Sequence, residues 1–169
     1  MELDKAQVES LLTTLVHIRI RPQMYFSNDV PAVQNWLYGF EAACRLFDVR
    51  IWDEAWKIYD ERGWDNGAMH PVQKMIEKGL SEDEVILEVF SVLILALQRK
   101  YPFGEEIVVK FHEEMRQNIE KTRQEIANPK GEFNVYRNEA VAQAERDRIE
   151  QTLKKLDSIE RVTGLKTGN

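Results

Sequence analysis

The sequence predicts an all-α protein: a compact helical core domain over residues 1–101, followed by a charged C-terminal helical hairpin or coiled-coil arm over residues 102–169. Apolar residues recur at three- and four-residue spacings along nearly the whole chain, which is the period of a helix. Prolines and glycines separate these runs. Composition changes after Tyr101: 12 of the 16 aromatic residues come before this point, and only four come after it.

Two helices are expected before residue 50. The first, over residues 3–20, has one apolar stripe and ends before Pro22, because the residue preceding a proline is pushed out of the helical region. The second, over residues 31–47, has Asp29 as a candidate cap and a proline in its first turn. The connector between them carries three large apolar side chains, which predicts that it packs onto the core.

Three further helices complete the predicted core domain. One runs from about residue 52 to 62 and ends at Gly63, and a short one covers 70–78 and closes at Gly79. Ser81 followed by Glu84 is a capping box, and it opens a helix that reaches about Lys100. Since this last helix is apolar nearly all round, we expect it to be the central buried helix.

The C-terminal part contains two amphipathic segments, over residues 108–126 and 141–159, with a break at 128–131. One interpretation is a helical hairpin whose narrow apolar seam packs on itself or on the core. The other is a coiled-coil arm, which would give a homodimer through residues 102–169. Each segment is only two to three heptads long, which is shorter than the three to four that favour a coiled coil.

Charge and composition exclude several classes of function. The net charge of −6 argues against general nucleic-acid binding and against docking on an anionic membrane. One cysteine, Cys44, permits no intrachain disulfide, and we expect it to be buried. The N-terminus has no signal-peptide pattern, and the longest apolar run, residues 89–97, is too short to span a bilayer. We therefore expect a cytoplasmic protein that contacts neither nucleic acid nor membrane.

Motifs for catalysis are missing from the sequence. Its three histidines are widely separated, and it has no nucleophile elbow and no glycine-rich phosphate loop. Glu84 and Glu88, four residues apart, suggest the metal-binding helices of all-α nucleotide pyrophosphohydrolases, but no second acidic set accompanies them. We expect no catalytic residue, metal or cofactor, and a small all-α hydrolase remains an alternative. Arg19 and Arg21 form the densest basic spot, and we expect them to satisfy carbonyls at the end of their helix.

The most unusual stretch of the sequence, residues 36–65, is rich in both aromatic and acidic residues. One interpretation is a tryptophan-rich core with an acidic solvent face. The other is a protein-binding surface, because tryptophan and tyrosine dominate binding hot spots and acidic residues steer a basic partner. The residues predicted to contact the partner are Trp52, Asp53, Glu54, Trp56, Asp60, Glu61, Trp64 and Asp65.

Residues 18–26, IRIRPQMYF, resemble an "IRxRPGMYxG" signature. The signature occurs in the ATPase domain of gyrase B subunits and in a group of small, mostly helical bacterial proteins, some of which resemble immunity proteins of polymorphic toxin systems. The eight glycines here build no ATP site, which favours the small helical group. That group also continues with segments similar to residues 36–43, 62–64 and 79–84, so the resemblance covers roughly residues 10–100.

The resemblance implies a signature loop that contains Arg19, Arg21, Pro22, Met24 and Tyr25. Gln23 and Ser27 stand where the pattern has glycines, so the resemblance does not define the backbone conformation of the loop. The implied function is a non-enzymatic protein-binding module, similar to an immunity protein that neutralises a toxin by occlusion, with a basic toxin domain as the expected partner. The alternative is a structural or adaptor protein that oligomerises through its C-terminal helices.

Overall fold

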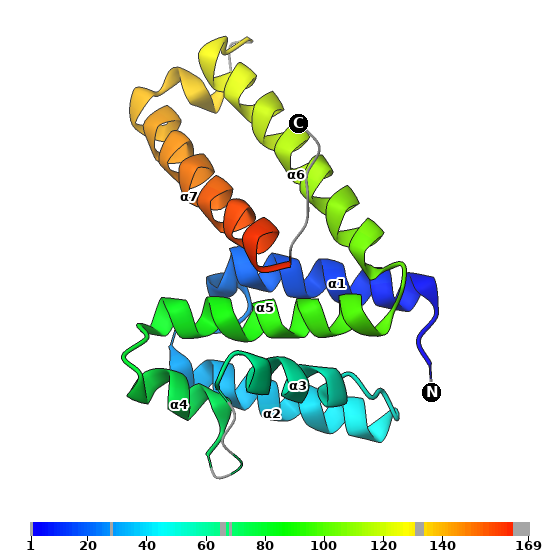
Figure 1. Cartoon of the computed structure of the whole chain (residues 1–169). Coiled ribbons are helices and arrows are strands. Elements are labelled where there is room, and N and C mark those ends of the chain that lie inside the picture. Colours follow the sequence, from blue (N-terminus) through cyan, green and yellow to red (C-terminus); the bar gives the residue numbers. More distant parts are fainter. Residues whose placement is uncertain (1, 28, 65–66, 68, 131–133, 164–169) are drawn as a thin grey trace. The chain divides into compact units, whose positions relative to one another are not determined.

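The structure is a computed structural model, and it describes residues 2–27, 29–64, 67, 69–130 and 134–163. These residues form seven α-helices and two short 3-10 helices without any strand, which confirms the all-α prediction (Figure 1). The chain divides into two compact units, Met1–Ile107 and Val108–Asn169. None of the described helices is both long enough and apolar enough to cross a membrane.

The first unit contains five α-helices. Their bounds are α1 (Lys5–Ile20), α2 (Val30–Leu46), α3 (Trp52–Glu61), α4 (Pro71–Glu77) and α5 (Glu82–Lys100). Within this unit α5 lies between α1 on one side and α2, α3 and α4 on the other (Figure 1). Ten of its residues are buried, so the prediction of a central helix is confirmed.

Local sequence signals place the helix ends. The carboxylate of Asp29 accepts from the Ala32 N–H at 2.8 Å, as predicted for the start of α2. Ser81 and Glu84 form the reciprocal bonds of a capping box at α5. Gly63 and Gly79 follow α3 and α4 with φ of 71° and 85°, a left-handed conformation that glycine adopts at little cost.

The connector after α1 differs from its prediction. Pro22–Met24 form the 3-10 turn η1, in which the Tyr25 N–H donates to the Pro22 carbonyl. This turn leaves Met24 68% and Tyr25 46% exposed, so these two large side chains do not meet the expectation that the connector packs onto the core. Phe26 alone meets it, with its ring stacked on Phe90 at 6.0 Å between centroids.

The second unit is an antiparallel hairpin. It consists of α6 (Gly104–Ala127), which begins shortly before the unit does, the 3-10 turn η2 (Val135–Arg137) and α7 (Glu139–Thr163). Arg116 of α6 donates to Asp157 and Glu160 of α7 at 2.7 and 2.9 Å. Apolar residues of the two helices are buried along the hairpin: Ile119, Ile126, Ala142, Ile149 and Leu156.

Candidate protein-binding surface

Helix α3 contains six of the eight predicted partner-binding residues, and Trp64 and Asp65 follow it in the sequence. Its buried side, Ala55, Ile58 and Tyr59, packs toward α5. Because side chains three and four residues apart share a helix face, Asp53 and Asp60 lie on either side of Trp56 along the outer part of α3. Both aspartates are exposed, and neither carboxylate makes a hydrogen bond or ion pair with any described residue.

Two residues from other elements extend this face. The ring of Trp56 meets the ring of His70 edge-on at 6.4 Å, and His70 meets Tyr38 of α2 at 5.7 Å. Tyr38 is 52% exposed, and Trp56 and His70 are half-buried. We call Tyr38, Asp53, Trp56, Asp60 and His70 the Trp56 surface.

His70 caps the N-terminus of α4. It precedes α4, where its Nδ1 accepts from the Val72 N–H at 3.3 Å. Burial lowers the pKa of His70, and the nearby carboxylate of Glu41 opposes this effect. The imidazole is therefore neutral at pH 7, consistent with Nδ1 acting as an acceptor.

Glu54 and Glu61 have partners within the chain. Glu54 pairs with Lys57 at 2.5 Å, which raises the pKa of Lys57. Glu61 accepts two bonds from the guanidinium of Arg99, at 2.8 and 2.7 Å, and this pairing lowers the pKa of Glu61. Of the four described acidic residues in the predicted set, only Asp53 and Asp60 have carboxylates without such a partner in the described part of the chain.

Trp52 and Trp64 contribute to the packing of the first unit. The Trp52 ring lies 6.3 Å from that of Phe40, and its buried indole N–H makes no hydrogen bond of standard geometry. Burial raises the pKa of the nearby Cys44 thiol to about 11, and the Trp52 indole N–H acts in the opposite direction, toward a lower pKa. The indole N–H of Trp64 donates to Glu88 at 2.8 Å, and Lys78 lies 4.9 Å from its ring centroid. Asp65 lies outside the described residues.

The signature loop begins with a buried arginine. Arg19 is 1% exposed, and its Nε donates to the Ser91 hydroxyl at 2.9 Å and to the Leu87 carbonyl at 3.3 Å. These bonds join α1 to α5, so the expectation that Arg19 satisfies carbonyls of its own helix is wrong for its Nε. Burial lowers the pKa of Arg19 to about 10, and Glu88 opposes the shift.

The rest of the loop is partly exposed. Arg21 is half-buried, and its backbone N–H donates to the His17 carbonyl. Pro22 is buried at the start of η1, and the exposed side chains of Met24 and Tyr25 follow it. The loop therefore combines a buried anchor with two apolar side chains in solvent.

The acidic pair considered for a hydrolase is engaged in the fold. Glu84 closes the capping box, and Glu88 accepts from Arg62 at 2.7 Å as well as from Trp64. Among the described residues, no group of three or more histidine, cysteine, aspartate or glutamate side chains is placed to hold a metal ion.

Sequence analysis missed two members of the Trp56 surface. His70 belongs to a separate predicted helix, and no local pattern connects it to Trp56. Tyr38 lies in an aromatic-rich stretch of sequence, but only the packing of α2 and α3 brings it near this face.

Comparison with known proteins gives no match. The chain matches no family model, no curated protein and no solved structure.

Proposed function

We propose that the chain is a non-enzymatic protein-binding module whose Trp56 surface docks on a basic patch of a partner protein. The proposed role is that of a bacterial cytoplasmic immunity protein, which neutralises a toxin domain by covering its surface. The kind of partner rests on the sequence resemblance at residues 18–26, and the location of the site rests on the structure.

The observation that carries the proposal is the pair of exposed, unpaired aspartates beside Trp56. Tryptophan and tyrosine supply a large contact area at low conformational cost, and they are enriched in binding hot spots. Carboxylates around such an anchor steer a basic partner and fix its orientation. The outer part of α3 supplies this charge: Glu54 and Glu61 pair with Lys57 and Arg99, and the carboxylates of Asp53 and Asp60 have no ion-pair partner in the described part of the chain.

The alternative of an oligomerising adaptor has less support. The isoleucines that would form an intermolecular seam are buried in the hairpin of a single chain. We therefore place the interface on the first unit.

The test begins with tagged full-length protein, purified from its native host together with any bound protein. Binding of the purified partner is then measured for the wild type and for a double charge reversal, Asp53→Lys with Asp60→Lys. We expect affinity to fall at least about tenfold, a change of about 1.4 kcal/mol in binding free energy. We also expect association to slow and its salt dependence to weaken, because steering by exposed charges is screened by salt.

A matched control is the double reversal Glu113→Lys with Glu114→Lys. These two residues are exposed on α6, so the change in net charge is the same but lies in the other unit. Wild-type affinity in the Asp53/Asp60 variant, or equal losses in both variants, would contradict this site. Tyr38→Ala tests the aromatic part, and we expect it to speed dissociation.

A further inference from the structure

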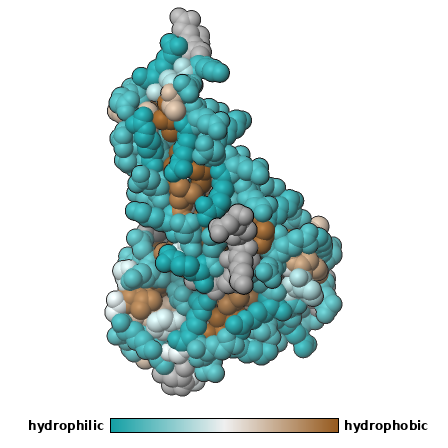
Figure 2. Space-filling view, turned by 45° about the horizontal axis from the view of Figure 1, so that its top comes forward, coloured by the Kyte–Doolittle hydropathy of each residue, from teal (hydrophilic) through white to brown (hydrophobic). Residues whose placement is uncertain are grey.

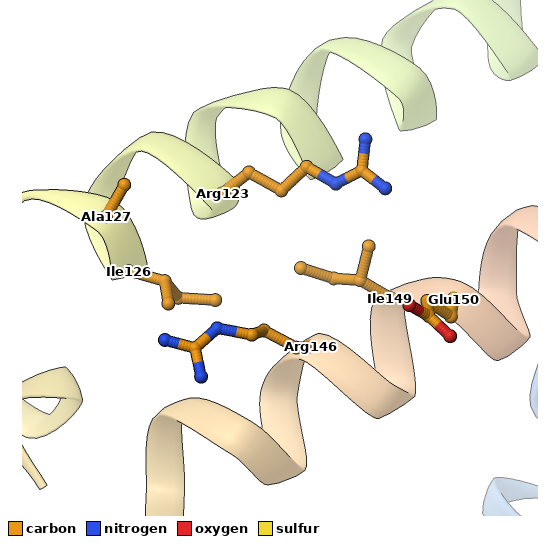
Figure 3. A pocket seen from close by; sticks show the side chains of 6 residues that line it. All are labelled: Arg123, Ile126, Ala127, Arg146, Ile149 and Glu150. Atoms are coloured by element: carbon orange, nitrogen blue, oxygen red, sulfur yellow. The ribbon is translucent and has the colours of Figure 1, made fainter. Parts of the chain in front are cut away.

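A pocket lies between the two helices of the hairpin. Arg123, Ile126 and Ala127 of α6 line it together with Arg146, Ile149 and Glu150 of α7, and its volume is about 320 Å³ (Figure 3). This volume is within the range of small-molecule sites, about 300–1,000 Å³. We propose that this pocket binds a monocarboxylate with a short apolar body, such as a medium-chain fatty acid. The proposal is independent of the Trp56 surface.

The floor of the pocket is apolar. Ile126 and Ile149 face each other from opposite helices, and only 7% and 5% of their surfaces remain exposed (Figure 3). Ala127 adds a small side chain, which leaves space for the ligand. Apolar surface also shows between polar side chains on the hairpin, in the upper part of Figure 2. Such a floor favours a hydrocarbon chain over a small hydrated anion.

The rim of the pocket is cationic. Figure 3 shows Arg123 of α6 and Arg146 of α7 extending in opposite directions, so that their guanidinium groups lie at opposite ends of the gap. Arg123 makes no hydrogen bond or ion pair with any residue that the structure describes. Arg146 is held by bonds from Nη1 to Glu139 at 2.7 Å and to Gln143 at 3.0 Å. Its Nε and Nη2 make no bond to a described residue, so both arginines have donors for a ligand.

The charges of the lining select the class of ligand. Arg146 is already paired with Glu139, so Arg123 is the arginine of the lining whose charge has no ion-pair partner among the described residues, and one such guanidinium suits a single negative charge. A planar carboxylate matches the fork of an arginine and accepts two parallel bonds from it. The apolar floor then accommodates the hydrocarbon part of the ligand. Inorganic phosphate has no such part.

The experiment is an NMR titration of the full-length, ¹⁵N-labelled chain with sodium octanoate below its micelle concentration. We expect saturable shifts confined to amides near residues 123–127 and 146–150. Octan-1-ol tests the role of charge, and inorganic phosphate tests the role of the apolar floor. We expect each to bind at least about tenfold more weakly than octanoate.

Two variants test the site itself, with circular dichroism to verify that each is folded. Arg123→Gln removes the unpaired guanidinium, and we expect octanoate binding to weaken at least about tenfold. Ala127→Leu fills the pocket without changing its charge, and we expect it to weaken binding to a similar degree. The matched control is Arg148→Gln, an exposed arginine of α7 that pairs with Glu145 and does not line the pocket.

Four results would overturn the proposal. These are the absence of saturable shifts, shifts spread over both units, phosphate binding as strong as that of octanoate, and an equal loss of affinity in Arg148→Gln and Arg123→Gln. The second result indicates detergent-like adsorption, and the third indicates a simple anion site.

Discussion

The four tryptophans of this chain show how much a residue's role depends on its surroundings. Trp36 stacks on Phe40 at 4.9 Å, Trp52 packs against the same phenylalanine, and Trp64 donates to Glu88. Trp56 alone lies between two unpaired exposed carboxylates. Trp52 and Trp64 fit the interpretation of a tryptophan-rich core, and the proposal of a binding surface depends on Trp56, whose ring also lies 5.9 Å from that of Tyr59.

At the residue scale, Cys44 is expected to be unreactive. Its pKa rises from 9.0 to about 11, chiefly because the thiol is buried. At pH 8 this shift alone lowers the thiolate fraction about 100-fold, and the thiolate is the reactive form. Alkylation by iodoacetamide, followed by mass spectrometry, should be slower by at least that factor in the native protein than in urea. Similar rates in both states would show that the thiol is accessible.

His70 should make stability depend on pH. Its pKa is lowered in the folded state, so the unfolded chain binds the proton more readily. Its contribution is therefore fully present above about pH 6.5, the value in the unfolded chain, and is lost as pH falls below it.

The variant His70→Asn isolates this contribution, because asparagine can cap α4 but does not titrate. Urea unfolding at pH 7.5 and 5.5 should show a smaller loss of unfolding free energy in the variant. His17, whose pKa is also lowered by burial, is present in both proteins and does not affect the comparison. Equal losses in the two proteins would contradict the assignment.

At the scale of the element, helix ends were the most readable feature of the sequence. Asp29, Ser81, Gly63 and Gly79 all stand where the structure ends or begins a helix. A cap acts on backbone groups within three or four residues of itself, so local sequence contains the needed information. The capping box at α1, formed by Asp4 and Gln7, was missed, because its partner is glutamine and the helix begins two residues later than predicted.

Removal of the α5 cap should have a measurable cost. Ser81→Ala leaves the Glu84 N–H without its hydroxyl partner, and we expect a loss of about 1 kcal/mol in unfolding free energy. Ser10→Ala, on the exposed side of α1, is the control and should change stability by less than about 0.5 kcal/mol. Equal effects in urea denaturation would mean that the capping box contributes nothing.

At the scale of the whole molecule, the first unit depends on α5. Leu93 is fully buried, whereas Leu46 at the end of α2 is 79% exposed. Leu93→Ala removes buried methyl groups and leaves a cavity, with an expected cost of about 2–5 kcal/mol. The same substitution at Leu46 should cost less than about 0.5 kcal/mol. The comparison uses thermal unfolding followed by circular dichroism, and a similar effect at the two positions would contradict the central place of α5.

The sequence predicted only those residues of the candidate sites that lie on one helix. Asp53, Trp56 and Asp60 could be chosen from α3 because helical spacing puts them together. Tyr38 and His70 could not, because their proximity to Trp56 depends on how α2 and α4 pack. The pocket of the hairpin was also missed, since residues 123–127 and 146–150 line it from two different helices.

The sequence by itself determined the helices, their caps and the buried character of α5, because hydrophobic period and capping act over a few residues. Only the tertiary structure decided which charged side chains have partners within the chain. Arg99 neutralises Glu61 from 38 positions away, Arg62 and Trp64 engage Glu88, and Arg19 bonds to α5. Such partners are set by the packing of helices distant in sequence, and their choice leaves Asp53 and Asp60 as the exposed charges beside Trp56.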